Sequence, residues 1–293
     1  MSKNIQVITH LDLDGVVSYL VLCWLYGQKL NVIGTTPKKL EEDYDKLLKS
    51  GKKWDRLYLL DLDVSKIGSL IDLPTTAIFD HHKTNIYPFK QAVTRIYNET
   101  SCAKLIYDSL FKHTNKTLTN NQKTLIALAD DWDSNTKSTP LSEGLNIVYH
   151  SMTNKFNSFV EDYYEGFKQF DKFKQNTILL YKKHRNEYLN QLVPFIGLVD
   201  FDEQKDIKIG AVFCDKFIQE CCDWLLTNHD VDVAIAVLIE QQRIAVRRNK
   251  NCNKIDVSKF VQRIASGGGH EAAAGGNLTD EFVEFTKMLK PLN

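Results

Sequence analysis

Short apolar runs that alternate with helix-length segments constrain the fold of this chain most strongly. Ile5-Gln6-Val7-Ile8 reads as a strand, and the apolar stretch that starts at Gly15 is long enough for a helix. The same alternation recurs at 30–33 and 38–49, at 57–60 and 65–71, and at 77–79. Alternating strands and helices indicate a parallel sheet with helices on both faces. An N-terminal α/β domain is therefore predicted.

Changes in this pattern predict three regions. Helical periodicity at 101–110 and 120–129 precedes a polar stretch, so the first domain is predicted to cover 1–150. Aromatic and apolar residues at helix spacing between 156 and 192 predict a helical connector over 151–193. We interpret its aromatic stripe as packing rather than as a base-stacking platform. Short β runs around a helix at 216–226 then predict a smaller α/β domain over 194–293.

Charge and cysteine content narrow the class of protein. The 37 basic and 37 acidic residues balance, so no global basic field is available for a long nucleic acid, and an anionic substrate has to be bound locally. The six cysteines contain no CxxC pair, which is typical of free thiols in a reducing compartment. The longest apolar stretch, Val16 to Tyr26, is shorter than the roughly 20 residues that cross a bilayer. We expect a cytoplasmic protein without a membrane segment.

Potential metal ligands follow three of the predicted strands. In an open parallel sheet, ligands bind outside the carboxyl ends of the strands. Carboxylates gathered there repel one another unless cations are present, and carboxylates mixed with imidazoles suit Mn²⁺, Mg²⁺ or Fe²⁺ better than structural zinc. A further acidic group closes a predicted helix. These segments are His10-Leu11-Asp12-Leu13-Asp14, Asp61-Leu62-Asp63, Asp80-His81-His82 and Asp130-Asp131-Trp132-Asp133.

Each of these motifs has a simpler interpretation when it is taken alone. Asp12 or Asp14 could cap the helix that begins near Gly15, and Asp61 or Asp63 could cap the next one. Adjacent histidines are often ordinary loop residues. The coincidence of all three motifs at the ends of consecutive strands favours a metal site.

The ordered motifs resemble those of the DHH phosphoesterases, and the run from Gly267 to Gly275 resembles the signature of the DHH-associated domain. The resemblance spans nearly the whole chain. It implies that two divalent ions, with Mn²⁺ preferred and Mg²⁺ or Fe²⁺ as alternatives, activate a water for hydrolysis. The implied ligands are His10, Asp12 and Asp61 for one ion, and Asp14, Asp61, His81 and Asp130 for the other.

The resemblance also implies roles beside the metals. Asp80 is expected to hold His81, and His82 is expected to face the substrate phosphate. Asp130 is preferred to Asp131 because it follows Leu128-Ala129 as in the family motif, and the role of Asp63 stays open.

The C-terminal glycine run has a physical logic of its own. Gly267, Gly268 and Gly269 would let backbone amides approach an anion, and the Ala-rich stretch after His270 could begin a helix whose N-terminus favours negative charge. By resemblance, Arg247 is the substrate-binding arginine. A glycine triplet alone would indicate only a flexible turn.

The family resemblance leaves several substrates open. The Gly-Gly-Gly-His run argues against a pyrophosphatase, and the neutral net charge argues against an exonuclease that acts on long single strands. A nanoRNase-like enzyme on short oligonucleotides is preferred, because the opening at Asp14 and the run from 80 to 84 look closest to that branch. Cyclic dinucleotide phosphodiesterase and phosphoadenosine phosphate phosphatase remain as alternatives, and a nucleotide-sequestering binding protein is the non-enzymatic one. Short oligonucleotides or nucleotides are the expected partners, no stable complex with long nucleic acid is expected, and a homodimer is allowed.

Overall fold

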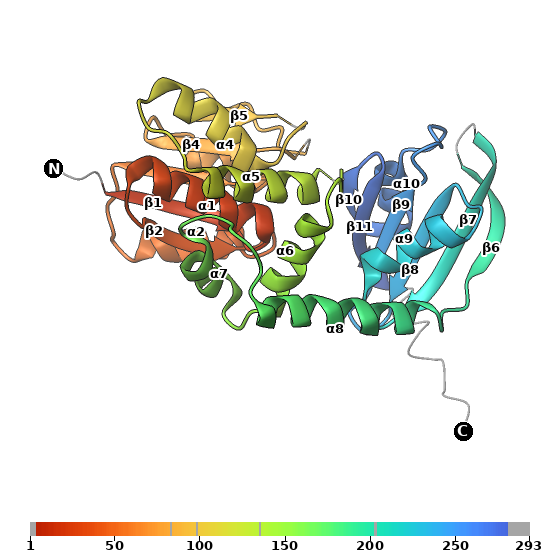
Figure 1. The fold of residues 1–293 in the computed structure, drawn as a ribbon. Helices are drawn as coiled ribbons and strands as arrows, with labels where there is room; N and C mark the ends of the chain where they lie inside the picture. Colours follow the sequence, from red (N-terminus) through yellow and green to blue (C-terminus); the bar gives the residue numbers. More distant parts are fainter. Residues whose placement is uncertain (1–3, 83, 98, 135, 202–203, 281–293) are drawn as a thin grey trace. The chain divides into compact units, whose positions relative to one another are not determined.

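The computed structural model describes residues 4–82, 84–97, 99–134, 136–201 and 204–280. The chain divides into two compact units, residues 1–181 and 182–293, and the division falls within helix α8 (Lys172–Leu189) (Figure 1). No helix in the described ranges is long and apolar enough to cross a membrane. Residue 83 of the DHH run and residues 281–293 of the predicted C-terminal domain lie outside the described residues.

The first unit contains a five-stranded sheet in which every neighbouring pair is parallel. The strand order is β2-β1-β3-β4-β5, so the carboxyl ends of all five strands lie at one edge. The predicted parallel-sheet domain is confirmed. The strands are β1 (Ile5–His10), β2 (Asn31–Thr35), β3 (Arg56–Leu60), β4 (Thr76–Asp80) and β5 (Val93–Ile96).

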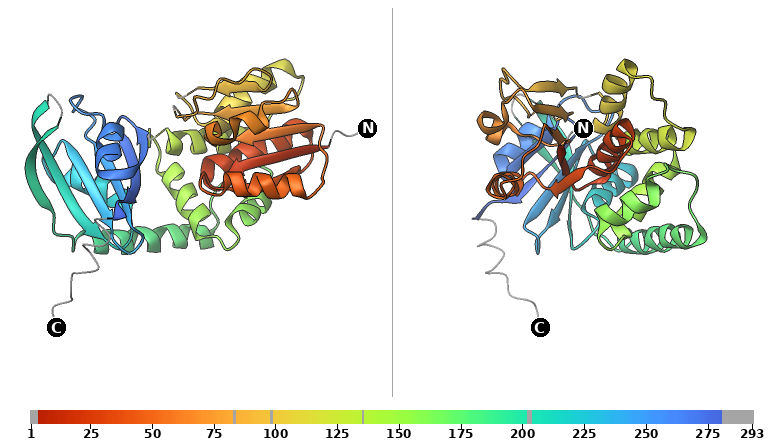
Figure 2. Two further views of the ribbon diagram at one scale, coloured as in Figure 1. Left: turned by 180° about the vertical axis from the view of Figure 1, so that it is seen from behind. Right: turned by 90° about the vertical axis from the view of Figure 1, so that its left-hand side faces the viewer.

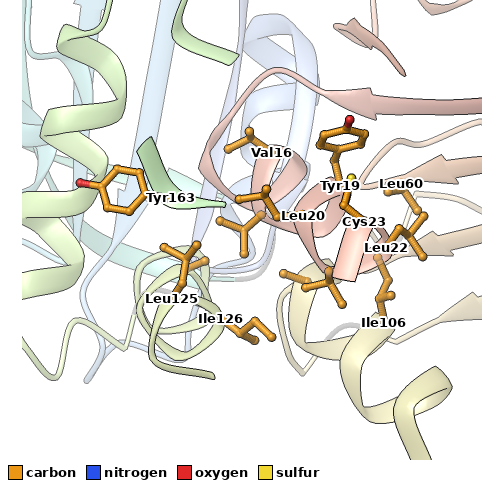
Figure 3. Close-up of a cluster of buried hydrophobic side chains, with 14 of the residues drawn as sticks. Val16, Tyr19, Leu20, Leu22, Cys23, Leu60, Ile106, Leu125, Ile126 and Tyr163 are labelled. Atoms are coloured by element: carbon orange, nitrogen blue, oxygen red, sulfur yellow. The ribbon is translucent and has the colours of Figure 1, made fainter. Parts of the chain in front are cut away.

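Helices cover both faces of this sheet because its strands are apolar on both sides (Figures 1 and 2). In β3, Tyr58 and Leu60 join the core formed with α1 (Leu13–Tyr26), α4 (Cys102–Leu110) and α5 (Asn120–Asp133). Figure 3 shows part of this core, including Leu20, Ile106 and Leu125. Leu57 and Leu59 join the opposite core, which contains α2 (Leu40–Lys49) and the helical turns η1 (Ser65–Ile67) and α3 (Gly68–Ile71).

Two further helices complete the first unit. The sequence did not predict α6 (Pro140–Ser151), although its start carries ordinary signals: Thr139 caps Leu141 N–H and a proline follows at the first position. Phe156 and Phe159 on α7 (Lys155–Tyr163) are buried in the core beside α1. For α7 the structure therefore confirms that the aromatic stripe packs, whereas Phe173 on α8 is 80% exposed.

The second unit contains a six-stranded mixed sheet with the order β10-β11-β9-β8-β7-β6. Only β7 and β8 pair in parallel among its described strands. Helix α9 packs on one core and α10 on another, which confirms the predicted smaller α/β domain. The elements are β6 (Phe195–Phe201), β7 (Gln204–Cys214), α9 (Ile218–Asn228), β8 (Val233–Leu238), β9 (Arg243–Arg248), α10 (Val257–Ile264), β10 (Ala265–His270) and β11 (Ala273–Leu278).

Two glycines with positive φ differ in the space around them. Gly166, at φ +86°, follows α7, and a Cβ added there would lie 2.3 Å from the backbone of Asn121 and Gln122 at the start of α5. Gly51, at φ +68°, follows α2, and an added Cβ would meet no described atom within 4 Å. The positive φ disfavours a side chain at both positions, but only at Gly166 would the side chain also clash with neighbouring backbone atoms.

We predict that Gly166→Ala destabilises the protein more than Gly51→Ala does. The φ penalty of roughly 1–2 kcal/mol applies to both variants. Overlap with the α5 backbone should add about 1–3 kcal/mol to the first variant only. Urea unfolding of the two variants beside the wild type measures the difference. Equal losses would show that the Gly166 contact does not constrain the start of α5.

Candidate metal centre

Histidines and aspartates meet at the carboxyl edge of the first sheet because β1, β3 and β4 are neighbours there. His10 ends β1, Asp61 follows β3, and Asp80 ends β4. The predicted convergence of the three motifs is therefore present. Asp61 has φ +56°, a left-handed conformation that Asp adopts more readily than most residues.

Asp61 lies between the two predicted histidine ligands. Its Oδ1 is 3.2 Å from Nε2 of His81, and its Oδ2 is 3.6 Å from Nδ1 of His10. The side chain is only 2% exposed. One carboxylate thus faces both imidazoles from the middle of the site.

Two helix N-termini hold the first motif. Asp12 caps α1 by accepting a hydrogen bond from Gly15 N–H at 2.9 Å, and its other oxygen is 2.7 Å from Nδ1 of His10. Asp14 is buried and accepts hydrogen bonds from the N–H groups of Cys102 and Ala103, at 2.7 and 2.9 Å, at the start of α4. Helix N-termini favour negative charge, so both carboxylates are fixed in position. Asp12 therefore caps α1, as the simpler interpretation of the motif predicts, and it also lies in the cluster of potential ligands.

Within the DHH motif, Asp80 orients His82. Its buried Oδ1 lies 2.7 Å from Nδ1 of His82 and accepts a hydrogen bond from the backbone N–H of His81. Asn85 donates to Oδ2 at 2.9 Å. The expected contact with His81 is therefore through the backbone, and the imidazole that Asp80 holds is that of His82. These contacts outweigh burial and lower the pKa of Asp80.

The structure brings Asp133, rather than Asp130, to the centre. Asp133 ends α5, and its Oδ2 lies 3.4 Å from Nε2 of His81. Asp130 lies one turn earlier and accepts a hydrogen bond from Ser101 N–H at 2.7 Å. Asp131 binds Ser138 and Ser142, and Asp63 caps the turn at Ser65. The sequence-based choice of Asp130 therefore conflicts with this geometry.

Three overlapping sets of potential ligand atoms result, each with its atoms within 4.8 Å of one another. Asp61 and His81 each belong to two sets, so the sets share ligands as adjacent metal sites do. The sets are His10, Asp12 and Asp61; Asp14, His81 and Asp133; and Asp61, His81 and His82.

Burial and like charge make this cluster electrostatically unfavourable without a cation. Burial first, and then neighbouring carboxylates, raise the pKa values of Asp14, Asp61 and Asp133. Burial opposes protonation of His10, but contacts with Asp12 and Asp61 outweigh it and raise its pKa to about 11. A cation at these positions would relieve the repulsion and burial cost that raise the carboxyl pKa values.

Buried carboxylate oxygens that accept no hydrogen bond indicate whether these residues fit a metal ion. Oδ2 of Asp61 and Oδ2 of Asp133 are buried and accept no hydrogen bond from any described residue. Buried polar groups are normally satisfied, so these oxygens are suited to a ligand from outside the chain. Hard oxygen and imidazole donors suit Mn²⁺, Mg²⁺ or Fe²⁺, and the donor set fits the predicted ions.

The predicted substrate residues lie in the second unit, in strands rather than in a loop. Arg247 is in β9, opposite Ala273 of β11. Gly267 to Gly269 form part of β10, which His270 ends. The glycines therefore lie in a strand rather than in a flexible turn, and the helix suggested after His270 is wrong because Ala273 begins strand β11.

Strand pairing explains two of these glycines. A Cβ at Gly267 would lie 2.1 Å from the carbonyl oxygen of Gly275, and Gly269 has φ +150°. At Gly268 an added Cβ would meet no described atom closer than 3.9 Å. Among these three glycines, only Gly268 would accept a Cβ without a steric clash.

The fold and the site define a class: a parallel α/β domain that gathers carboxylates and imidazoles at its strand ends, followed by a smaller α/β domain. Residues 215–291 match the sequence profile of the DHHA1 domain. No curated protein sequence is similar enough to this chain to count as a relative.

Solved structures share this fold at low sequence identity. The DHH domain of a protein assigned to a ribosomal protein family has a TM-score of 0.69 at 14% identity, over 99% of this chain and 88% of that one. The pGpG-specific phosphodiesterase PggH from Vibrio cholerae has 0.56 at 14%, over 97% and 96%. The exonuclease RecJ bound to manganese has 0.54 at 14%, over 98% and 88%. At these identities the likeness shows the fold alone.

We predict that Asp61→Asn stabilises the metal-free protein at neutral pH. The raised pKa of Asp61 means that ionisation costs stability as pH rises above the ordinary carboxyl range, and the amide removes that cost. Asn also tolerates the positive φ. Thermal melts in a chelator at pH 5 and pH 8 should show the larger gain at pH 8. A lower melting temperature for the variant at pH 8 would contradict the electrostatic argument.

Proposed function

We propose that this protein is a metal-dependent phosphoesterase that hydrolyses short oligonucleotides. The observation that carries the proposal is the set of ligand clusters that share Asp61 and His81. The DHHA1 match in the second unit and the DHH-type fold support it.

The chain's own residues divide into two groups under this proposal. His10, Asp12 and Asp61 would hold one ion, and Asp14, His81 and Asp133 would hold the other, with Asp61 also beside His81. The ions, with Mn²⁺ preferred, would lower the pKa of a water and neutralise charge at phosphorus. Asp80 fixes the ring of His82 through Nδ1, which aims its Nε2 for a hydrogen bond to a phosphate oxygen or for a place among the ligands.

The second unit is proposed to bind the substrate. Arg247 offers a guanidinium for bidentate contact with phosphate, and His270 offers a ring donor at the end of β10. At Gly268 the nearest atoms to an added Cβ are the side-chain amide nitrogen of Gln262 at 3.9 Å and the hydroxyl of Ser258 at 4.0 Å, two polar groups beside a backbone that an anion would approach.

A short substrate is preferred on two grounds. The chain has no net charge, whereas proteins that follow long single strands rely on basic grooves and stacking aromatics. The fold neighbour PggH is specific for pGpG, a dinucleotide. RecJ is an exonuclease with the same fold, so exonuclease activity on long single strands is the second candidate function. A nucleotide-sequestering protein would be expected to lack a ligand, whereas three sets of potential ligands are present here. Turnover of a generic phosphodiester separates the two classes of protein.

We predict that Asp133→Asn weakens Mn²⁺ binding and that Asp130→Asn does not. The first change removes a charged ligand oxygen beside His81, and affinity should fall by more than about tenfold. In the second variant the amide oxygen can still accept the hydrogen bond from Ser101. Isothermal titration of the two variants with Mn²⁺ makes the comparison, because each replaces a carboxylate at the end of α5. Loss of Mn²⁺ affinity in Asp130→Asn alone would restore the sequence-based assignment.

We predict that kcat/KM falls with substrate length. Each phosphate beyond the site gains little on a neutral protein, so RNAs from two to roughly thirty nucleotides should be hydrolysed progressively less well. Few phosphates would be contacted, so salt should have a weak effect. Steady-state assays at fixed Mn²⁺ and two salt concentrations test both points. Rapid, salt-sensitive cleavage of the longest strands would favour the exonuclease function instead.

A further inference from the structure

A groove in the first unit, which we call the α4–α5 groove, lies between those two helices (Figure 1). Its volume of about 380 Å³ is in the range of pockets that hold small ligands. One face of each helix lines it, because the lining positions recur at helical spacing. The residues that matter here are Lys104 and Tyr107 of α4, and Lys123, Ile126, Ala127 and Asp130 of α5.

The α4–α5 groove and the candidate metal centre share two helix ends. Asp130 lines the groove and lies one turn before the potential ligand Asp133. At the start of α4, the N–H of Ser101 binds Asp130, and the next two N–H groups bind Asp14. Lys104, the residue after these, lines the groove. One end of the groove therefore lies within a helical turn of residues proposed to hold an ion.

Charged groups are distributed unevenly along the groove. Asp130 and Asp131 lie at the end next to the metal centre, whereas Lys123 lies seven residues earlier on α5, about 10 Å away along the helix. Lys123 is exposed and forms no ion pair with any described residue, while Lys104 pairs with Asp108 at 2.6 Å. A phosphate would thus be repelled at the metal end, outside the ions themselves, and attracted at Lys123.

The wall between these two ends is largely apolar. Ile126 joins the core, Ala127 is exposed beside it, and the half-buried ring of Tyr107 packs against that of Phe111 with centroids 5.3 Å apart (Figure 3). A flat ring can lie against such a wall. At the metal end, only Oδ1 of Asp130 accepts a hydrogen bond from a described residue, so its Oδ2 can accept one from a ligand.

We propose that the α4–α5 groove binds the nucleoside of the substrate next to the bond that is cleaved, and that Lys123 binds the phosphate beyond that nucleoside. The order of groups matches: a carboxylate for sugar hydroxyls or base amino groups, an apolar wall for the base, and a cation for the phosphate. The inference rests on the proposed function and deepens it, because it makes a dinucleotide with a terminal phosphate the preferred substrate.

Two substitutions test the groove without changing a potential metal ligand. Lys123→Ala removes the charge at its far end. Ala127→Leu adds bulk to its wall, and leucine is a good helix former, so the variant should fold. Lys112→Ala is the matched control, because Lys112 is exposed, does not line the groove, and its loss changes the net charge equally. Thermal melts verify that each variant is folded.

The assay compares dinucleotides with and without a phosphate at the 5′ or the 3′ end, at fixed Mn²⁺. The wild type should prefer one phosphorylated form, and Lys123→Ala should reduce that preference, a ratio of kcat/KM values, about two- to fivefold. Ala127→Leu should lower kcat/KM for every dinucleotide, and Lys112→Ala should leave the ratio unchanged. No preference for a terminal phosphate in the wild type, or an equal reduction in Lys112→Ala, would overturn the proposal.

Binding without turnover separates failure of this inference from failure of the proposed function. The probe is a phosphorylated dinucleotide with a non-hydrolysable phosphonate linkage, titrated by calorimetry in the presence of Mn²⁺. Weaker binding by Lys123→Ala and Ala127→Leu than by Lys112→Ala supports the groove even if the wild type hydrolyses no phosphodiester, in which case the proposed function alone fails. Equal binding by the wild type and all three variants would overturn the groove assignment.

Discussion

The burial of Asp61 among other carboxylates is the constraint on which the rest of the candidate site depends. Burial and the charges of Asp12 and Asp14 all oppose its ionisation. The N-termini of α1 and α4, whose N–H groups bind those two neighbours, stabilise the negative charge of Asp12 and Asp14 rather than that of Asp61. Oδ2 of Asp61 and Oδ2 of Asp133 accept no hydrogen bond from any described residue and lie 3.6 and 3.4 Å from imidazole nitrogens of His10 and His81, so a cation would offset much of the remaining cost.

Local patterns predicted much of this arrangement. Strand ends are visible in the sequence because a buried parallel strand is a continuous apolar run, and a polar residue such as His10 or Asp61 marks where it stops. Sheet order then brings the ends of β1, β3 and β4 together. The residue types and their meeting point were therefore accessible before the structure.

The choice between Asp130 and Asp133 was not accessible in the same way. Each residue turns a helix by about 100°, so the two lie on similar sides of α5 and differ mainly in height. Which of them reaches His81 depends on where α5 ends against the sheet, and that is a tertiary property. The only local hint was that Asp133 is the last acidic residue before a polar stretch. The conformation of the glycine run was not predictable for a related reason. Glycine indicates only that the backbone is free to adopt many conformations, and the pairing with β11 shows that Gly267 adopts that of a strand.

Unsatisfied polar atoms carry information that neither motifs nor packing supply. Stable cores avoid them, since each costs free energy and contributes nothing to the fold. In the described part of the chain, Asp61 and Asp133 each keep such an oxygen: Oδ2 of Asp61 lies 3.6 Å from Nδ1 of His10, and Oδ2 of Asp133 lies 3.4 Å from Nε2 of His81. Selection for stability alone would replace these two carboxylates by amides, so their presence together favours a cation as the ligand that they share a site to bind.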